Sequence, residues 1–596
     1  MCGIAGYIDL AKNVDITTLI GMRDTLTHRG PDAAGVYISD DRNVGLAHRR
    51  LSFIDLSDAG IQPMVSANGR YIVSFNGEIY NFKQLREALE RDGYVFQSQT
   101  DTEVLLHGYD AWKEQLPKYL KGMFAFAIYD DSEKILFLAR DRFGIKPLFY
   151  GHSSTCFAFA SELKAIFSLP FFPKKIKKES VGKFLANRYV PTPNTMWENV
   201  YKLPPAHWMK IKTDTLQIEE KRYWQLVVSA KNERKDAAEI ISQKLTKSLE
   251  EHLLSDVPIG AFLSGGMDSS ALTVLMKQLA YEPLDFFSIG FSGWNESEHE
   301  YAKLVADKLH ANLHTLLLDK ISIETVETLM YYYDDPIADI SILPTYAVSG
   351  IASKKVKAVV SGEGADESFG GYWWQKPASF YFSSAFHRIK SRVFGKSFAE
   401  IKKHYIQAMS MGLFDKEELG RAFTADWQDA VSDDPFAHFD RFEQKGSSTL
   451  KQIQFLDIHT FMSELILTKV DRASMAHSLE VRVPFLDHEL VEFLFGLPDD
   501  SYFDEHIQKR EIRKLLQGHV PAIIYERKKQ GFVGPDKFYM DMEVYNMLLV
   551  GNLIKDGVIR KEYVVDLLAE KDHWRLWKLF VLENWWKIWV KGGESK

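Results

Sequence analysis

The feature that most constrains how this chain can fold is a change of sequence pattern between residues 210 and 235. Before it, short β-rich runs alternate with turn signals. Beyond it, short apolar runs typical of strands alternate with longer amphipathic runs. The first pattern is typical of an α+β unit, and the second of βαβ units around a parallel sheet. We therefore expect two differently built units in one chain.

The first unit is expected to contain several strands and one clear helix. In residues 71–75 every second side chain would lie on one face of a strand, and the Asn-Gly pair at 76–77 would then break the pattern. Residues 82–92 form a helical run that Asn81 can cap and Gly93 can end. Further strands are expected at Gly3–Ile8, Val44–His48, Ile135–Ala139 and Thr155–Ala160. Together these elements predict a two-layer α+β domain.

The second unit is expected to begin with an amphipathic helix, whose apolar residues recur every fourth position: Ile241, Leu245, Leu249 and Leu253. A strand at 259–263, a glycine turn and another helix follow. Further strands are expected at 284–291, 312–318 and 356–361, with a helix at 301–309 after the first of them. This alternation predicts a parallel sheet covered by helices.

Two other segments frame these units. The proline-containing run 189–208 (YVPTPNTMWENVYKLPPAHW) is expected to return along the first unit and close it. Past residue 375 the pattern becomes mainly helical, and it ends in a tryptophan-rich tail at 573–590. At helical spacing such aromatic residues indicate core packing, so we expect the tail to be buried.

Composition excludes several classes of protein. With 46% apolar and 26% charged residues, the chain of 596 residues is globular rather than disordered. Its net charge of −8 argues against a nucleic-acid partner. No apolar run approaches the ~18 residues of a membrane span, and the start lacks a secretion signal. The two cysteines, Cys2 and Cys156, exclude a disulfide framework and suit the cytoplasm, and Cys156 is expected to pack in a strand.

Cys2 carries the first chemical argument. If Met1 is removed, Cys2 presents a thiol and a free α-amine on one residue. An α-amine has a pKa of about 8, so near neutral pH it can take the thiol proton and leave a nucleophilic thiolate. The alternative interpretation is a buried structural cysteine at a chain end. Support for the nucleophile comes from five segments downstream: HRGPD (28–32), AHRRLS (47–52), FNGEIYN (75–81), TDTEV (100–104) and GMFAFAIYD (122–130).

With these segments, residues 2–215 resemble the class II glutamine amidotransferase domain, an N-terminal-nucleophile hydrolase whose fold is an αββα sandwich. The resemblance implies that Cys2 attacks the side-chain amide of glutamine. Asn76 and the Gly77 backbone would form the oxyanion hole. The glutamine ligands would be Arg50 for the α-carboxylate, Asp101 with Glu78 for the α-ammonium, and Asn76. Donors aimed at developing negative charge and a two-pronged guanidinium on a carboxylate suit these roles.

Two glycine-rich segments in the second unit predict a nucleotide site. Residues 262–270 (FLSGGMDSS) follow a strand and open a helix, and residues 360–372 (VSGEGADESFGGY) follow another. Neither ends as a Walker A loop does. Glycines after a strand let backbone N–H groups approach an anion, and the carboxyl ends of parallel strands bind ligands. Asp268 and Asp366 are expected to converge there and hold Mg²⁺.

These segments resemble the ATP-pyrophosphatase domain of the asparagine synthetase family, here over residues 235–590. Further matches are 334–346, 469–487, Lys509 with Arg513, and ERKKQGF at 526–532. By resemblance, Glu363 would orient or deprotonate the incoming ammonia. ATP would be bound by Leu263, Ser264, Gly265, Gly266, Asp268, Ser269, Ile289, Ser361, Gly362 and Lys509. The fold class expected for the whole chain is thus an N-terminal-nucleophile sandwich followed by an α/β parallel-sheet domain with a helical C-terminal part.

The resemblance implies a glutamine-dependent asparagine synthetase, in which ammonia from glutamine passes through a tunnel to an aspartyl adenylate made from ATP and L-aspartate. Met123, Arg29 and Ile145 are expected near the tunnel. The alternative is a member of the same family that amidates another carboxylate, such as a uronic-acid sugar of a surface polysaccharide or an antibiotic precursor. The intact amidotransferase residues argue against an intramolecular amide synthetase or a binding protein, and SGGMDSS against a phosphoribosyl amidotransferase. A cytoplasmic homodimer is expected, with no membrane or nucleic-acid partner.

Overall fold

The computed structural model describes residues 2–229, 236–294, 297–319, 322–376, 397–504, 507, 509–527, 531, 534, 539 and 542–592. The strands of the first unit are β1 (Gly3–Asp9), β2 (Ala33–Ile38), β3 (Val44–Arg50), β4 (Met64–Val65), β5 (Tyr71–Ile79), β6 (Gly122–Asp130), β7 (Ile135–Arg140), β8 (Phe149–His152), β9 (Cys156–Ala160), β10 (Val200–Lys202), β11 (His207–Lys212) and β12 (Ile218–Arg222). Its helices are α1 (Ile16–Asp24), α2 (Phe82–Arg91), α3 (Thr102–Trp112), α4 (Leu116–Tyr119), α5 (Leu163–Ile166) and α6 (Lys178–Asn187).

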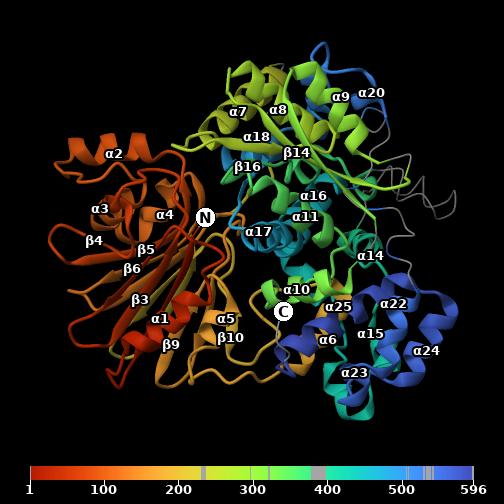
Figure 1. The fold of residues 1–596 in the computed structure, drawn as a ribbon, viewed down its shortest axis with the longest axis horizontal. Helices are drawn as coiled ribbons and strands as arrows, with labels where there is room; N and C mark the ends of the chain where they lie inside the picture. Colours follow the sequence, from red (N-terminus) through yellow and green to blue (C-terminus); the bar gives the residue numbers. More distant parts are fainter. Residues whose placement is uncertain are drawn as a thin grey trace.

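The first unit consists of two six-stranded sheets packed face to face. One has the order β10-β8-β9-β1-β3-β2 and the other β12-β11-β7-β6-β5-β4, and all their pairs are antiparallel. Apolar side chains from both sheets fill the space between them, and helices cover the outer faces, with α2 and α3 on one side and α1 on the other (Figure 1). The predicted αββα sandwich is confirmed, and its last strand extends beyond residue 215 to Arg222.

Two local predictions in this unit are wrong. The Asn-Gly pair at 76–77 does not break its strand, because β5 runs on to Ile79 and pairs with β6 along its whole length. Gly77 instead allows two strands to approach closely: its φ is +151°, and a Cβ there would lie 2.0 Å from the carbonyl oxygen of Met123. Asn81 stands before α2 without capping it, because its side chain binds the backbone of Tyr119 and Lys121.

The second unit is built on a five-stranded parallel sheet, as predicted, in the order β15-β14-β13-β16-β17. Its strands are β13 (Ile259–Phe262), β14 (Asp285–Phe291), β15 (Asn312–Leu318), β16 (Ala358–Val360) and β17 (Glu480–Arg482). The helices around it are α7 (Ala237–His252), α8 (Met267–Gln278), α9 (His299–Leu309), α10 (Ile323–Tyr332), α11 (Ile342–Ala352) and α12 (Ala365–Phe369). The sheet is covered on both faces, since its residues belong to two separate apolar clusters.

The rest of the chain is mainly helical. It comprises α14 (Phe398–Met409), α15 (Lys416–Ala422), α16 (Thr449–Asp457), a π-helix (Ile458–Ile466), α17 (Leu467–Met475), α18 (His488–Phe495), α19 (Arg510–Leu516), α20 (Ile523–Glu526), α22 (Met542–Asn546), α23 (Asn552–Lys555), α24 (Lys561–Glu570) and α25 (His573–Trp589). The tryptophan-rich tail is α25, and its packing role is confirmed: Trp585 is fully buried, with its ring centroid 5.3 Å from that of Trp197. Cys156 is buried in β9, as expected.

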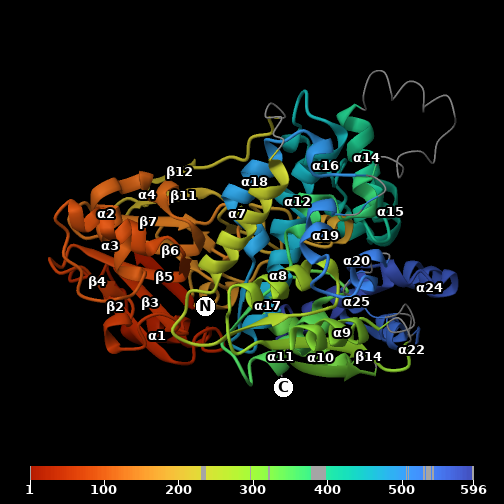
Figure 2. The same ribbon diagram turned by 90° about the horizontal axis from the view of Figure 1, so that it is seen from above.

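The two units share a long interface. The amino-terminal end of the chain lies at this boundary in both Figure 1 and Figure 2, between the sandwich and the helices around the parallel sheet. Ion pairs cross it: Lys121 of the sandwich lies 2.9 Å from Asp487 and 2.7 Å from Glu251. Within the described part of the chain, no helix is long and apolar enough to cross a membrane.

Candidate active sites

Cys2 lies directly before β1 and is buried at the boundary between the units. Its backbone N–H donates to Asn76 Oδ1 at 2.9 Å, and its Sγ lies 3.9 Å from the carbonyl oxygen of Leu51. Burial raises the pKa of the Cys2 thiol, so the thiol needs a base to become a nucleophile. Met1, whose removal was expected, lies outside the described residues.

Asn76 lies in the middle of β5, and among the described residues only one of the two polar atoms of its side-chain amide has a hydrogen-bond partner. Oδ1 accepts from Cys2, whereas the buried Nδ2 has no hydrogen-bond partner among the described residues. An orphaned buried donor is costly, and beside a nucleophile it is suited to bind an oxygen that becomes negative. Gly77 follows directly on the same strand. The structure therefore brings Cys2, Asn76 and Gly77 together.

Arg50 ends β3 and turns into the loop that follows. Its guanidinium donates to the carbonyl oxygens of Ser57, at 3.0 Å, and of Asp55. Gly60 packs against it, since a Cβ at this glycine would lie 2.0 Å from Arg50 Nη2. Backbone carbonyls hold the side chain in place without neutralising it, so its positive charge remains available to a carboxylate.

Asp101 and Glu78 lie close to one another beside β5. Asp101 accepts the backbone N–H of Ile79 at 2.9 Å, and burial raises its pKa to about 6. Burial also raises the pKa of Glu78 well above its usual value, while the nearby Arg482 opposes this shift. Two acids thus lie together in a poorly solvated environment, which suits binding of an ammonium group.

Arg482 was not predicted from the sequence as a site residue, although its Nη2 lies 3.4 Å from Glu78 Oε2. It belongs to β17 of the second unit, far from Glu78 in the chain. The segment 469–487 was matched as a motif, but nothing in its spacing indicates that one of its arginines faces the first unit.

The loop after β13 forms a polar cradle. Ser264 and Ser269 face each other with their Oγ atoms 3.2 Å apart, and the Gly266 N–H donates to Ser264 Oγ at 3.3 Å. Gly265 has φ +72°, and a Cβ there would lie 2.5 Å from the Ala302 backbone. The twelve-residue helix α8 begins just beyond. Serine hydroxyls, close backbone and a helix N-terminus fit the phosphates of a nucleotide.

The second glycine-rich loop packs against this cradle from β16. A Cβ on Gly362 would lie 3.0 Å from the Cβ of Asp268, so the two loops touch. Ser361 donates its backbone N–H to Arg482. Glu363 Oε2 is buried and has no hydrogen-bond partner in the described part of the structure, so this oxygen is free to face a substrate. Leu263 and Ile289 are buried beside these loops, and the Leu263 N–H donates to the Phe287 carbonyl.

Lys509 joins the two acids that were expected to hold Mg²⁺. Its Nζ lies 2.5 Å from Asp268 and also pairs with Asp366. Burial opposes the charge on this lysine, but the two carboxylates raise its pKa. A Cβ at Gly371 would lie only 1.8 Å from Asp366 Oδ1, so a larger residue there would displace this carboxylate. The predicted residues therefore converge at the carboxyl edge of the parallel sheet.

This donor set fits Mg²⁺ that is also bound by phosphates. Two carboxylates, those of Asp268 and Asp366, converge on the Lys509 ammonium. Across the described residues, no group of three or more His, Cys, Asp or Glu side chains could hold a metal ion by itself. Mg²⁺ commonly takes one or two carboxylates and completes its shell with phosphate oxygens and water.

Arg527 also lies beside this site. It belongs to the matched segment at 526–532, but it was not predicted as a site residue. Its guanidinium donates to the Gly265 carbonyl at 3.2 Å and lies 3.3 Å from Glu298. It therefore braces the phosphate cradle. Arg513, matched together with Lys509, lies in α19 and donates to the Tyr525 carbonyl. Within the motif at 526–532, residues 528–530 and 532 lie outside the described residues.

Arg29 links Cys2 to the second unit. Its Nε donates to the Cys2 carbonyl at 3.1 Å, and its two terminal nitrogens donate to Asp471 at 2.8 and 3.0 Å. The surrounding buried ion network balances three cations and three acids: Arg29, Lys164, Arg472, Glu162, Asp334 and Asp471. Ile145 lines a cavity between the units, next to Asp471 and Arg472. Met123 and Arg29, also expected near a tunnel, do not line that cavity.

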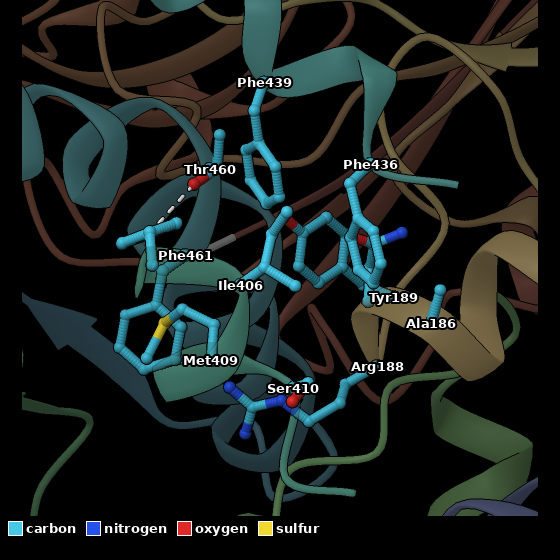
Figure 3. Close-up of a pocket in the computed structure, with 12 residues that line it drawn as sticks. Ala186, Arg188, Tyr189, Ile406, Met409, Ser410, Phe436, Phe439, Thr460 and Phe461 are labelled. Carbon is cyan, nitrogen blue, oxygen red and sulfur yellow. Dashed lines mark hydrogen bonds between the residues drawn. The ribbon is translucent and has the colours of Figure 1, made fainter. Parts of the chain in front are cut away.

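A separate cavity lies between the end of α6 and α14 (Figure 3). Aromatic side chains from several segments surround it, including Tyr189, Phe436 and Phe461, and the buried Arg188 borders it. None of the predicted site residues lines this cavity. It is therefore distinct from both candidate sites.

Family models and curated relatives identify the two units of the chain. The family model described as a glutamine amidotransferase domain matches residues 1–224, and the one described as asparagine synthase matches residues 241–587. The glutamine-hydrolysing asparagine synthetase 1 of Bacillus subtilis is 33% identical over 99% of this chain and 97% of its own length. A putative glutamine-hydrolysing asparagine synthetase of Mycobacterium bovis is 31% identical over 99% of this chain and 98% of its own. Among solved structures, the glutamine PRPP amidotransferase of B. subtilis matches with TM-score 0.29 and 17% identity, covering 53% of this chain and 65% of its own.

Proposed function

The chain belongs to the asparagine synthase family, and from that premise we propose that it is a glutamine-dependent, ATP-using asparagine synthetase. It hydrolyses glutamine in the sandwich and delivers the ammonia to an aspartyl adenylate made on the parallel sheet. The observation that carries this proposal is the presence, in one chain, of a buried cysteine beside an unpartnered amide donor and of a phosphate cradle with converging acids.

The first half reaction begins with Cys2. Removal of Met1 would turn the Cys2 nitrogen into an α-amine that can take the thiol proton. The thiolate then attacks the side-chain amide carbon of glutamine, and the oxyanion is stabilised by Asn76 Nδ2 and the Gly77 N–H. Ammonia leaves as the tetrahedral intermediate collapses to a thioester, and water hydrolyses the thioester to glutamate. Arg50 would bind the α-carboxylate, and Glu78 with Asp101 the α-ammonium.

The second half reaction activates the acceptor. The β-carboxylate of aspartate attacks the α-phosphorus of ATP, which releases pyrophosphate and leaves an acyl adenylate. Ser264, Ser269 and the Gly265–Gly266 backbone would bind the phosphates, with Asp268 and Lys509 beside them. Mg²⁺ held by Asp268 and Asp366 would neutralise charge on the phosphates. Glu363 would take a proton from the attacking nitrogen, and AMP leaves as asparagine forms.

The transfer between the sites is proposed to run along the interface. Arg29 connects the Cys2 backbone to Asp471, and the cavity lined by Ile145 lies next to the same aspartate. Water exclusion along such a path would keep ammonia unprotonated. We also propose a cytoplasmic homodimer without a nucleic-acid partner; the family resemblance supports the dimer, and the net charge of −8 argues against nucleic acid.

The assignment of glutamine hydrolysis and asparagine formation to two separate sites is tested with Cys2→Ala. The variant is expected to lose glutamine-dependent asparagine formation and to keep ammonia-dependent formation, because only the first site needs the thiol. A parallel measurement of pyrophosphate release, with aspartate first and uronic acids as comparators, identifies the acceptor. Loss of both activities in a folded variant would refute the two-site mechanism, and pyrophosphate release with another acid but not with aspartate would refute the acceptor.

A further inference from the structure

Arg482 of β17 reaches across the interface into the glutamine pocket. Its side chain is fully buried. The Nε donates to Glu480 at 2.6 Å, and Nη1 donates to the carbonyl oxygens of His252 at 2.7 Å and Leu254 at 2.8 Å. These contacts fix the guanidinium to its own unit. The remaining nitrogen, Nη2, lies 3.4 Å from Glu78 Oε2 and makes no hydrogen bond to any described residue.

The charge of the Glu78 carboxylate is sensitive to a neighbouring cation. Glu78 is buried on β5 beside a second acid, Asp101, and both desolvation and the nearby Glu480 favour its protonated form. A protonated Glu78 would carry no charge for the α-ammonium of glutamine. The guanidinium of Arg482 opposes this protonation and comes from the other unit, so the first unit alone lacks this cation.

The same residue also touches the nucleotide site through its backbone. Its carbonyl oxygen accepts the N–H of Ser361 at 2.9 Å, directly before Gly362. This contact continues the pairing of β17 with β16, in which Arg482 lies opposite Val360. One residue therefore contacts the predicted ligands of both substrates, with its side chain on one and its backbone on the other.

We propose that Arg482 is a positioning residue of the glutamine site, supplied by the synthetase unit, which holds the Glu78 carboxylate toward the α-ammonium of glutamine and favours its charged form. This inference rests on the proposed function of the Cys2 site. It implies that the glutaminase is complete only when the two units are docked, because its ammonium-binding acid is held by β17.

A purely structural clasp is the competing explanation, and the geometry separates the two. Three hydrogen bonds already anchor Nε and Nη1 within the second unit. A role confined to stabilising the second unit would need nothing more, yet Nη2 faces Glu78 of the first unit at ion-pair distance. A substitution should therefore affect glutamine binding selectively rather than all activities together.

The test uses the full-length chain with Arg482→Met and Arg482→Lys. Arg482→Met is expected to raise the KM for glutamine by about 30-fold, because the acid loses its buried partner. Ammonia-dependent asparagine formation should stay within about twofold of wild type, because the Ser361 contact is made by the backbone. Arg482→Lys should recover part of the loss. Lys121→Met, which breaks a buried ion pair across the same interface without touching Glu78, is the matched control and should leave the KM for glutamine unchanged.

A double-mutant cycle with Glu78→Gln completes the test. If Arg482 acts through Glu78, adding Arg482→Lys to Glu78→Gln should change the KM for glutamine little, whereas independent effects would multiply. This comparison remains decisive if Arg482→Met does not fold. An unchanged KM, multiplying effects, or a parallel fall of ammonia-dependent activity would overturn the inference. A wild-type enzyme without glutamine-dependent activity would instead refute the proposed function from which it starts.

Discussion

Asn76→Ala is the perturbation whose effect can be worked out most fully. The Asn76 amide has two tasks in the structure: Oδ1 accepts the Cys2 N–H at 2.9 Å, and Nδ2 is a buried donor without a partner among the residues described. Losing an oxyanion-hole donor costs about 2.7–4 kcal/mol of transition-state stabilisation. Losing the acceptor of one neutral hydrogen bond costs about 0.5–1.5 kcal/mol.

The lost donor alone predicts that glutaminase kcat falls by about 10²–10³, and the lost hydrogen bond to Cys2 extends the upper end to about 10⁴, since about 1.4 kcal/mol corresponds to a factor of ten. Asn76 was also expected to contact bound glutamine, but Arg50, Glu78 and Asp101 remain, so the KM for glutamine should change much less than kcat. Asn76→Asp keeps an oxygen for the Cys2 N–H and replaces the donor with a second acceptor. Its loss should be at least as large.

The assay measures glutamate release at saturating glutamine, together with asparagine formation from ammonium salts as a control for the second site. The control activity should match that of wild type. The reasoning would be refuted if Asn76→Ala kept kcat within about tenfold of wild type. It would equally be refuted if only the KM rose, because Asn76 would then bind the ground state and transition state equally.

Three further predictions concern other parts of the molecule. Burial raises the pKa of Asp101 to about 6, and only the ionised carboxylate attracts an ammonium group. The kcat/KM for glutamine should therefore fall as the pH drops below 6, and a flat profile from pH 5 to 8 would contradict this. Lys509→Met should abolish asparagine formation from glutamine and from ammonia while glutamate release continues; intact synthesis would exclude a role for Lys509 at the phosphates. Trp585→Ala should lower the free energy of unfolding by about 3–5 kcal/mol in urea denaturation, and a loss under about 1 kcal/mol would show that the tail contributes little packing.

The sequence predicted the elements whose signal is local. The parallel sheet followed from strand and helix alternating along the chain, and the nucleotide loops from glycines placed directly after apolar strands. Cys2, Asn76 and Asp268 stand in short motifs, so they could be named without coordinates. Residues within one motif are neighbours along the chain, whereas their partners in other segments, such as Asn76 for Cys2, were implied only by the family resemblance.

What the sequence missed depends on contacts between distant segments. The Asn-Gly pair at 76–77 is a frequent turn signal, but pairing with β6 over the whole strand overrides that local preference. Asn81 has a capping side chain, yet the neighbouring segment at 119–121 offers it other partners. Arg482 could not be linked to Glu78 from the sequence, because the contact forms only where β17 of the second unit lies against β5 of the first.

The most direct test of the account follows the nitrogen itself. Wild-type enzyme is supplied with ATP, aspartate, glutamine labelled with ¹⁵N in its amide, and unlabelled ammonium kept below the concentration at which ammonia alone supports synthesis, and the asparagine formed is analysed by mass spectrometry. The account predicts that the amide of asparagine carries the label in nearly the proportion present in glutamine, because ammonia released at Cys2 reaches the adenylate within the protein. Asparagine whose label follows the bulk ammonium pool would contradict transfer between the two sites.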